Sequence, residues 1–310
     1  TGRDSLTINI DKEALWKKLK KLGNLKTEEA RAVFDLGEDS TDWGVENAKK
    51  ELLDTGPNPN YIHEILYRPF DKRYSYYTGR SRGLITRPRK EIMLHLLRTN
   101  IALTVGRQWG AIGSKIYDIM FVSDSLVDYN LFRRGGEMVF PLSLYSDIEH
   151  VFQEQTSNIK EEIIKKYKDR FSLNRDSSVQ PTEVFYYIYG ILNSIKYRKK
   201  YEEFLKIDFP RIPIMNNYEV FLQISGFGKE LAGLHLLKHE SLNLPSAKYF
   251  GNGTNHVDKI EYVTGNVQIN DLNYFGPISE EVFQFTIGGY QVCHKWLKDR
   301  KGKELTLEEV

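Results

Sequence analysis

The sequence predicts an α+β fold, with a mixed-sheet lobe over residues 61–150 and a second α+β lobe over residues 181–310. First, 310 residues with 40% hydrophobic and 13% aromatic side chains are enough for a globular core. Second, segments with strand character gather in the first lobe. Third, apolar residues recur at helical spacing in much of the second lobe. A single cysteine, Cys293, leaves no internal disulfide, and we expect a reducing, cytoplasmic setting.

The first 60 residues are predicted to be mostly helical. A short strand is expected over residues 6–10, and Asp11 can cap a helix that runs through Leu22. Two further helices are predicted over 27–34 and 45–53. The turn-forming run Gly56-Pro57-Asn58-Pro59-Asn60 then marks a boundary near residue 60.

The first lobe is predicted to combine several strands with one helix that begins near Pro88. The apolar segment 101–105 predicts a buried strand. This strand would present Arg107 and Gln108 at its end, ahead of a Gly-rich loop that reaches Lys115. The other strands are expected over 62–67, 74–77, 116–122 and 138–144.

The second half begins with residues 151–180, which are highly charged and are predicted to form a linker with a solvated helix. Helices over 181–192 and 197–205 predict a helical hairpin. A longer helix over 217–237 should be interrupted by Gly226 and Gly228. Strands over 259–263 and 267–270 flank a turn at Gly265-Asn266 and predict a β-hairpin. A last helix is expected over 291–300.

Positive charge is concentrated in one part of the chain. Residues 67–115 contain 11 Lys or Arg against 2 Asp or Glu, a local net charge of +9, whereas the whole chain sums to +2. The remainder therefore nets about −7. Aromatic and aliphatic residues are interleaved with these cations, so the segment is predicted to fold rather than to form a basic tail. A folded basic face indicates binding to a polyanion, and nucleic acid is the first candidate.

Two kinds of contact to duplex DNA are predicted from these cations. Arginine can pair bidentately with guanine and glutamine with adenine, so Arg107 and Gln108 are candidates for reading bases, as are Arg133 and Arg134 in a Gly-rich turn. Lys115 and its loop are candidates for a backbone contact. The remaining candidates would neutralise phosphates, and they are Arg80, Arg82, Arg87, Arg89 and Lys90. The alternative is that these cations form a solvated face or pair with the acidic remainder.

No catalytic, metal or cofactor site is predicted from the other motifs. Residues 58–61 differ by one residue from the Asn-Pro-Pro-aromatic loop of amino-methyltransferases, and they lack the hydrophobic strand that precedes that loop. The segment 105–115 does not have the spacing of a nucleotide-binding phosphate loop. His235 and His239 lie four residues apart, as zinc ligands can, yet no Glu follows the first in the metalloprotease order.

Six phrases, spread over nearly all of the chain, stand in an order that indicates one family. They are residues 65–73 (ILYRPFDKR), 86–89 (TRPR), 139–142 (VFPL), 181–189 (PTEVFYYIY), 204–213 (FLKIDFPRIP) and 287–292 (IGGYQV), followed by Lys295-Trp296-Leu297. Together they resemble the C-terminal specificity region of single-chain restriction-modification enzymes of the Type ISP kind.

The resemblance implies that a nuclease, a helicase-type ATPase and an adenine-N6 methyltransferase precede this region, and that this region selects the DNA sequence. It therefore implies a target recognition domain that places the target adenine for catalytic domains on the same polypeptide. S-adenosylmethionine, ATP and Mg would belong to those absent domains, and this fragment would need no cofactor.

We accordingly expect double-stranded DNA and the catalytic domains of the same polypeptide as partners, and no membrane. We also expect a piece of a longer chain, because strand-like alternation is under way near Gly2 and Thr306 could cap a helix that has only started. The first 60 residues would link to the methyltransferase. Two alternatives stay open: a methyltransferase or nuclease in its own right, or a module whose basic face binds an acidic protein or RNA.

Overall fold

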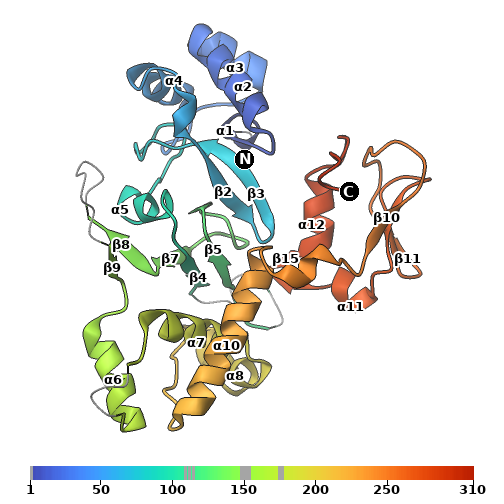
Figure 1. Cartoon of the computed structure of the whole chain (residues 1–310). Helices are drawn as coiled ribbons and strands as arrows, with labels where there is room; N and C mark the ends of the chain where they lie inside the picture. Colours follow the sequence, from blue (N-terminus) through green and yellow to red (C-terminus); the bar gives the residue numbers. More distant parts are fainter. Residues whose placement is uncertain (1–2, 108–109, 111–112, 114–115, 147–154, 174–177) are drawn as a thin grey trace.

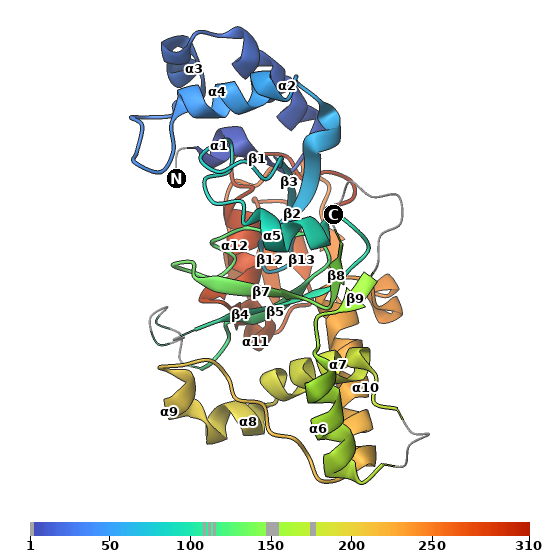
Figure 2. The ribbon, with the colours of Figure 1, turned by 90° about the vertical axis from the view of Figure 1, so that its left-hand side faces the viewer.

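The structure is a computed structural model, and it describes residues 3–107, 110, 113, 116–146, 155–173 and 178–310. Figure 1 shows the helices of the first 54 residues at one end, the sheets of residues 62–145 in the middle and the helices of residues 161–235 at the other end. Residues 248–298 lie beside the middle. The view in Figure 2 shows the same order along the molecule. Helices and sheets occupy separate regions, which confirms the predicted α+β class.

The N-terminal part consists of α1 (Asp4–Thr7), β1 (Ile8–Asn9), α2 (Lys12–Asn24), α3 (Thr27–Phe34) and α4 (Val45–Asp54). The three longer helices agree with the prediction. Asp11 caps α2, because its side chain accepts a hydrogen bond from the Ala14 amide at 2.6 Å. The predicted strand over 6–10 is wrong in its first half. The α1 turn instead places the fully buried Leu6 side chain in one core with Leu15 and Leu19.

Two small sheets follow. The first has the strand order β1-β3-β2-β6, in which β2 (Ile62–Arg68) is antiparallel to β3 (Asp71–Tyr76) and parallel to β6 (Leu126–Val127). The second is antiparallel, with β4 (Ala102–Gly106) between β5 (Met120–Ser123) and β7 (Glu137–Pro141). Because Gly106 pairs with Glu137, the end of β4 and the start of β7 lie at the same edge of this sheet.

Short elements connect the sheets to the rest of the chain. η1 (Pro59–Tyr61) precedes β2, and α5 (Lys90–Met93) with η2 (Leu94–Leu96) lies between β3 and β4. The helix predicted near Pro88 starts only at Lys90, because Arg89 has a left-handed backbone with a φ of 45°. It consists of these two short turns. β8 (Ser143–Tyr145) pairs with β9 (Gln155–Ser157), and α6 (Glu161–Phe171) is the solvated helix expected in the charged segment.

The helices at the far end are arranged around α7 (Pro181–Asn193) and α10 (Tyr218–His235), which pack against each other. The helix predicted over 197–205 is divided into α8 (Ile195–Lys200) and α9 (Glu202–Leu205), which follow α7 after a break at Ser194. The predicted helical hairpin is wrong in its partner, because α7 packs mainly on α10. The helix itself was predicted over 217–237, but its packing against α7 was not.

Two glycines explain how α7 and α10 come together. A Cβ added at Gly190 would lie 2.7 Å from the carbonyl oxygen of Ile224, and one at Gly228 would overlap the carbonyl oxygen of Tyr186. The helix backbones therefore touch where glycine removes the side chain. α10 is continuous through Gly226 and Gly228, so the predicted interruption is wrong.

The last part of the chain forms a four-stranded antiparallel sheet of order β10-β13-β12-β11. The predicted β-hairpin is confirmed as β11 (Glu261–Val263) and β12 (Asn266–Gln268). Its turn lies at Thr264-Gly265 rather than Gly265-Asn266, because both turn residues have positive φ, 48° and 85°, as a type I′ turn requires. The other elements are η4 (Glu240–Asn243), β10 (Lys248–Phe250), β13 (Tyr274–Gly276), α11 (Glu280–Phe283), β14 (Thr286–Ile287), β15 (Tyr290–Gln291) and α12 (Val292–Lys298).

Three apolar clusters hold these parts together. One joins the N-terminal helices to β2 and β3. A second joins both middle sheets to α7 and α10, and Phe121 and Tyr189 are fully buried in it. The third packs α11 and α12 on the last sheet, around Val267 and Leu297. We call residues 248–310, which contain this third cluster, the C-terminal unit. In the part of the chain that the structure describes, every helix is too short or too polar to cross a bilayer.

Candidate nucleic-acid interface

The basic segment predicted from the sequence divides into buried and exposed cations. Arg68 is buried and pairs with Asp128 at 2.8 Å. Arg73 pairs with Asp71 at 2.6 Å and with Asp299 at 2.8 Å. These two arginines are neutralised inside the fold, so they add little to an outer basic face. The charge count of residues 67–115 therefore overstates the exposed positive charge.

The buried pairs connect the first sheet to the C-terminal unit. The guanidinium groups of Arg68 and Arg73 lie 3.7 and 4.0 Å from the ring centroid of Tyr67, on β2. Asp299 accepts hydrogen bonds from Lys295 and Arg73. Burial acts to raise the pKa of the Asp299 carboxyl, but the bonds from Lys295 and Arg73 outweigh burial and lower that pKa below its usual range. Asp299 is therefore held as a carboxylate.

A further buried arginine, Arg300, contributes from just after α12. Arg300 is 4% exposed and reaches Asp71 at 3.5 Å and Glu309 at 2.6 Å, and its guanidinium group lies 3.5 Å from the ring centroid of Trp296. Asp71 thus lies between two arginines that are far apart in the sequence. We call the connected set the ion-pair network, and it consists of Asp71, Arg73, Lys295, Asp299, Arg300 and Glu309. The Arg68–Asp128 pair lies next to it, because the Tyr67 ring contacts both Arg68 and Arg73.

Four of the five predicted phosphate contacts lie on the loop between β3 and α5, at Arg80, Arg82, Arg87 and Arg89, and the fifth, Lys90, is the first residue of α5. Arg80 pairs with Asp54 at 2.6 Å, and Arg87 pairs with Asp42 at 3.4 Å. The other three form no ion pair with any carboxylate in the described ranges. The alternative prediction, that these cations pair with acidic residues, therefore holds for Arg80 and Arg87. Both of their ion pairs are partly exposed to solvent.

A buried acid that the sequence analysis did not select holds this loop in place. Glu51 on α4 is 1% exposed, and its carboxylate accepts hydrogen bonds from the Leu84 amide and the Thr78 hydroxyl. A Cβ at Gly83 would collide with the same carboxylate. Burial raises the pKa of Glu51, and the bonds from Thr78 and Leu84 oppose that shift. A Glu on the buried face of a predicted helix is the signal that could have revealed it.

The predicted base-reading position at the end of β4 is exposed. The Arg107 side chain is 55% exposed, its Nε lies 3.3 Å from Asp208, and its guanidinium group lies 5.9 Å from the ring centroid of Phe209. These contacts from the segment after α9 orient Arg107 without burying it. Gln108 and Lys115, the other two candidates here, lie outside the described residues.

The turn between β6 and β7 connects the candidate residues. Arg133 and Arg134 are exposed on this turn. Tyr129, from the same turn, lies 5.6 Å from the guanidinium group of Arg89, which brings the loop 77–90 alongside. The C-terminal end of the turn leads into β7. The start of β7 lies beside the end of β4, and Arg107 is the residue directly after β4. We call this continuous surface the basic edge, and it comprises the loop 77–90, the turn 128–136 and the end of β4.

A buried carboxyl group lies directly under the basic edge. Glu137, the first residue of β7, is 3% exposed, and its Oε2 has no hydrogen-bond partner among the described residues. Burial raises the pKa of Glu137 to about 9, and nearby Asp128 acts in the same direction. Glu137 is therefore protonated and neutral at pH 7.

We expect Glu137→Gln to make stability less dependent on pH. The unfolded carboxyl loses its proton near its ordinary pKa of 4.5, whereas the folded one keeps it to about 9. The folded state therefore binds more protons between these values, and the free energy of unfolding of the wild type falls as pH rises. Urea unfolding at pH 5 and pH 8 should show the variant gaining about 2–4 kcal/mol relative to wild type over that interval. A stability difference that stays constant with pH would contradict this prediction.

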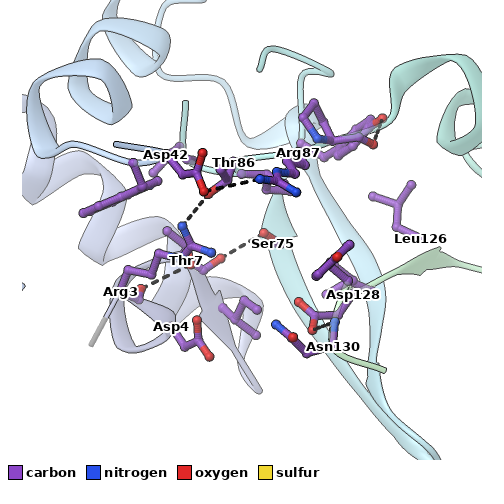
Figure 3. Close-up of a pocket in the computed structure, with 18 of the residues that line it drawn as sticks. Arg3, Asp4, Thr7, Asp42, Ser75, Thr86, Arg87, Leu126, Asp128 and Asn130 are labelled. Carbon is purple, nitrogen blue, oxygen red and sulfur yellow. Dashed lines mark hydrogen bonds and ion pairs between the residues drawn. The ribbon is translucent and has the colours of Figure 1, made fainter. Parts of the chain in front are cut away.

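A cavity of about 520 Å³ opens beside the basic edge, between the N-terminal segment, the loop 84–88 and residues 126–130 (Figure 3). Figure 3 shows Arg87 directed to Asp42 and Arg3 directed to Thr86. Four acidic residues line the cavity against two arginines, and they are Asp4, Glu38, Asp42 and Asp128. A phosphate would be repelled there, so Arg87 is less suited to a phosphate contact than Arg82 or Lys90.

The histidine pair singled out in the sequence is structural. The Nδ1 atom of His235 lies 2.5 Å from the Tyr189 hydroxyl, and burial lowers the pKa of His235 to about 4. His239 instead interacts with Ser241 through its Nδ1, at 2.8 Å. Within the described ranges, no group of three or more His, Cys, Asp or Glu side chains could hold a metal ion.

The fold and the basic edge define a class of α+β module that presents cationic loops on two small sheets. Comparison with protein-family models assigns the chain more closely. Residues 1–309 match the Type ISP C-terminal specificity domain, and the chain belongs to this family. None of the curated proteins matches it.

Solved structures share the fold. The chain is similar to the ATP-dependent Type ISP restriction-modification enzyme LlaBIII bound to DNA, with a TM-score of 0.71 and 22% identity over 97% of this chain and 20% of that one. A DrdV–DNA complex gives a TM-score of 0.69 at 19% identity, over 96% of this chain and 30% of that one. A nuclease-deletion mutant of the Type ISP enzyme LlaGI, in complex with a DNA substrate mimic, gives 0.63 at 20% identity, over 99% and 29%. The chain thus spans less than a third of each of these longer chains.

Proposed function

We propose that this chain is the target recognition domain of a restriction-modification enzyme and that it binds a specific sequence in duplex DNA. The observation that carries the proposal is the basic edge, where three segments far apart in the sequence bring exposed arginines to one surface. Membership of a specificity-domain family supports it. The similar structures of LlaBIII, DrdV and LlaGI, each described with DNA, support duplex DNA as the ligand.

The basic edge divides into two kinds of contact. Arg82, Arg89 and Lys90 have no carboxylate partner in the described part of the chain, so they are free to neutralise phosphates. Arg107 is exposed yet oriented by Asp208 and Phe209, and a pre-oriented guanidinium group suits bidentate pairing with guanine. Arg134 joins it as a candidate at the same edge of the sheet. Phosphate contacts would fix the register, and base contacts would select the sequence.

In this proposal the domain performs no chemistry of its own. It places the target adenine for a methyltransferase on the same polypeptide, which would bind S-adenosylmethionine, while ATP and Mg would serve the helicase-type and nuclease domains. We infer that this chain needs no cofactor, because none of the nucleotide- or metal-binding motifs fits its sequence. We also propose that residues 1–60 link to the methyltransferase, that 61–150 form the recognition lobe, that 151–180 form a linker and that 181–310 form the second lobe.

The proposal is tested by selecting duplexes from a randomised pool and then comparing two variants on the selected sequence. Arg107→Ala should reduce discrimination against single-base changes by about 1–3 kcal/mol at one position, because one bidentate contact is lost. Arg82→Ala should weaken binding to all duplexes alike and reduce the slope of log affinity against log salt by about 0.9. Fluorescence anisotropy across salt concentrations measures both effects.

Lys166→Ala, on α6 among the helices at one end of the molecule and outside the basic edge, is the matched control and should change neither quantity. Competition with single-stranded DNA and RNA belongs to the same experiment. Equal competition by RNA, or the absence of any preferred duplex, would count against sequence-specific DNA recognition. Methyl transfer by the isolated chain from labelled S-adenosylmethionine would show that it is an enzyme in its own right.

A further inference from the structure

A cationic pocket lies outside the basic segment predicted from the sequence. It measures about 390 Å³ and lies between the turn 128–136 and α12 of the C-terminal unit. Its wall on the turn is Arg133. Its opposite wall includes His294 and Lys298, which are four residues apart and therefore on one face of α12. Tyr290, Lys295 and Asp299 also line the pocket.

The positive charge of this pocket is uncompensated. Its carboxylate, Asp299, is already engaged with Arg73 and Lys295 in the ion-pair network. Arg133 and Lys298 form no ion pair within the described ranges, in contrast to Arg80, Arg87 and Arg107. Two free cations on opposite walls can share one anion, and the network prevents Asp299 from taking that place.

The two walls are fixed relative to each other. The Arg133 amide donates a hydrogen bond to the Gly288 carbonyl at 2.7 Å, and the Gly288 amide donates to the Asp118 carbonyl at 2.8 Å. Gly288 has a φ of 61°, and a Cβ there would collide with the ring of Phe132. The β14–β15 turn is therefore docked on the turn 128–136, and α12 follows directly after β15. The pocket is built before any ligand arrives.

We propose that this pocket binds one phosphate of the DNA backbone, and that it extends the basic edge onto the C-terminal unit. The inference rests on the proposed function. It adds a phosphate contact from the C-terminal unit, whose overall charge is not basic. The pocket continues the turn 128–136, whose Tyr129 already meets Arg89, so a single strand could follow all three segments. Arg133 is thereby assigned to the backbone rather than to base reading. Such a contact sets the register and carries no sequence information.

The test compares Arg133→Ala, Lys298→Ala and the double variant with Lys301→Ala, an exposed control one turn beyond α12 that does not line the pocket. Binding of a selected duplex and of an unrelated duplex is measured at several salt concentrations. The double variant should lower the salt slope by about 0.9 for both duplexes, since the two side chains hold one phosphate. Phosphate-ethylation interference should show one strong position in wild type that disappears in the double variant. Lys301→Ala should behave as wild type.

The outcomes separate the two proposals. If wild type binds duplex DNA, while the double variant keeps both the salt slope and the interference pattern, the phosphate pocket is refuted and the proposed function stands. If wild type shows no duplex binding at all, the proposed function itself fails. Titration with inorganic phosphate, followed through the His294 ring signals, provides the third arm. Binding of free phosphate without any effect on DNA would overturn the assignment to the DNA backbone.

Discussion

Replacing Asp71 with alanine is expected to destabilise the chain by about 3–5 kcal/mol, the usual cost of removing one partner from a buried charge cluster. Asp71 is 3% exposed and accepts hydrogen bonds from Arg73 at 2.6 Å and from Arg300 at 3.5 Å. Without its carboxylate, two guanidinium groups remain in the interior with only Asp299 and Glu309 to balance them. Urea unfolding measures the loss.

The same substitution should loosen the C-terminal unit more than the rest. Arg300 and Asp299 belong to that unit, whereas Asp71 and Arg73 belong to β3, so the network joins two cores. Hydrogen exchange should therefore increase in β10–α12 before it increases in α7 and α10. Asp54→Ala is the matched control, because it breaks the partly exposed Arg80–Asp54 pair and should cost less than about 1 kcal/mol. Equal losses for the two variants would show that burial of the network does not matter.

Replacing Gly228 with alanine should cost about 3 kcal/mol or more, although alanine is the better helix former. The added methyl group would overlap the Tyr186 carbonyl oxygen, and no side-chain rotation can relieve a clash with backbone. α7 and α10 would have to separate, which opens gaps in the large core that contains Phe121 and Tyr189. Thermal or urea unfolding measures the effect.

Gly226→Ala provides the matched control within the same helix. A Cβ at Gly226 would meet nothing within 4 Å, so alanine should stabilise α10 by about 0.5–1 kcal/mol through its helix propensity alone. The two variants should therefore change stability in opposite directions. A destabilisation of similar size in both would mean that the glycines serve helix flexibility rather than helix contact.

The elements that local signals define could be predicted from the sequence. Caps and apolar spacing located α2, α3 and α4, and the β11–β12 hairpin followed from its turn residues. Contacts over long sequence separations could not be predicted in this way. The role of Gly228 depends on Tyr186 in another helix, so the glycine looked like a helix break rather than a contact. Leu6 lies in a helical turn because its side chain packs in a core that includes Ile62 and Tyr76, which are far away in the sequence.

The candidate site was predicted in part for the same reason. The arginines of the loop 77–90 and Arg107 do reach one surface, because the turn 128–136 contacts both: its Tyr129 lies against Arg89, and β7, which follows it, starts beside the end of β4. A count of charges cannot show that Arg68 and Arg73 meet carboxylates at Asp128 and Asp299, because those partners lie far away in the sequence. Nor could it show that Lys298, from a region of opposite net charge, faces Arg133. Assignment of Gln108 and Lys115 stays a prediction.

The β14–β15 turn is attached to the middle of the molecule mainly through peptide groups, at the Gly288 and Arg133 main chains and the Asp118 carbonyl. The Asp118 carboxylate adds one bond, which it accepts from the Gly289 amide at 3.3 Å. Peptide groups are common to every residue type, so most of this attachment survives side-chain changes on both sides as long as Asp118 is kept and Gly288 keeps its room beside Phe132. Side chains of the segment that follows can therefore change without displacing α12 from the turn 128–136.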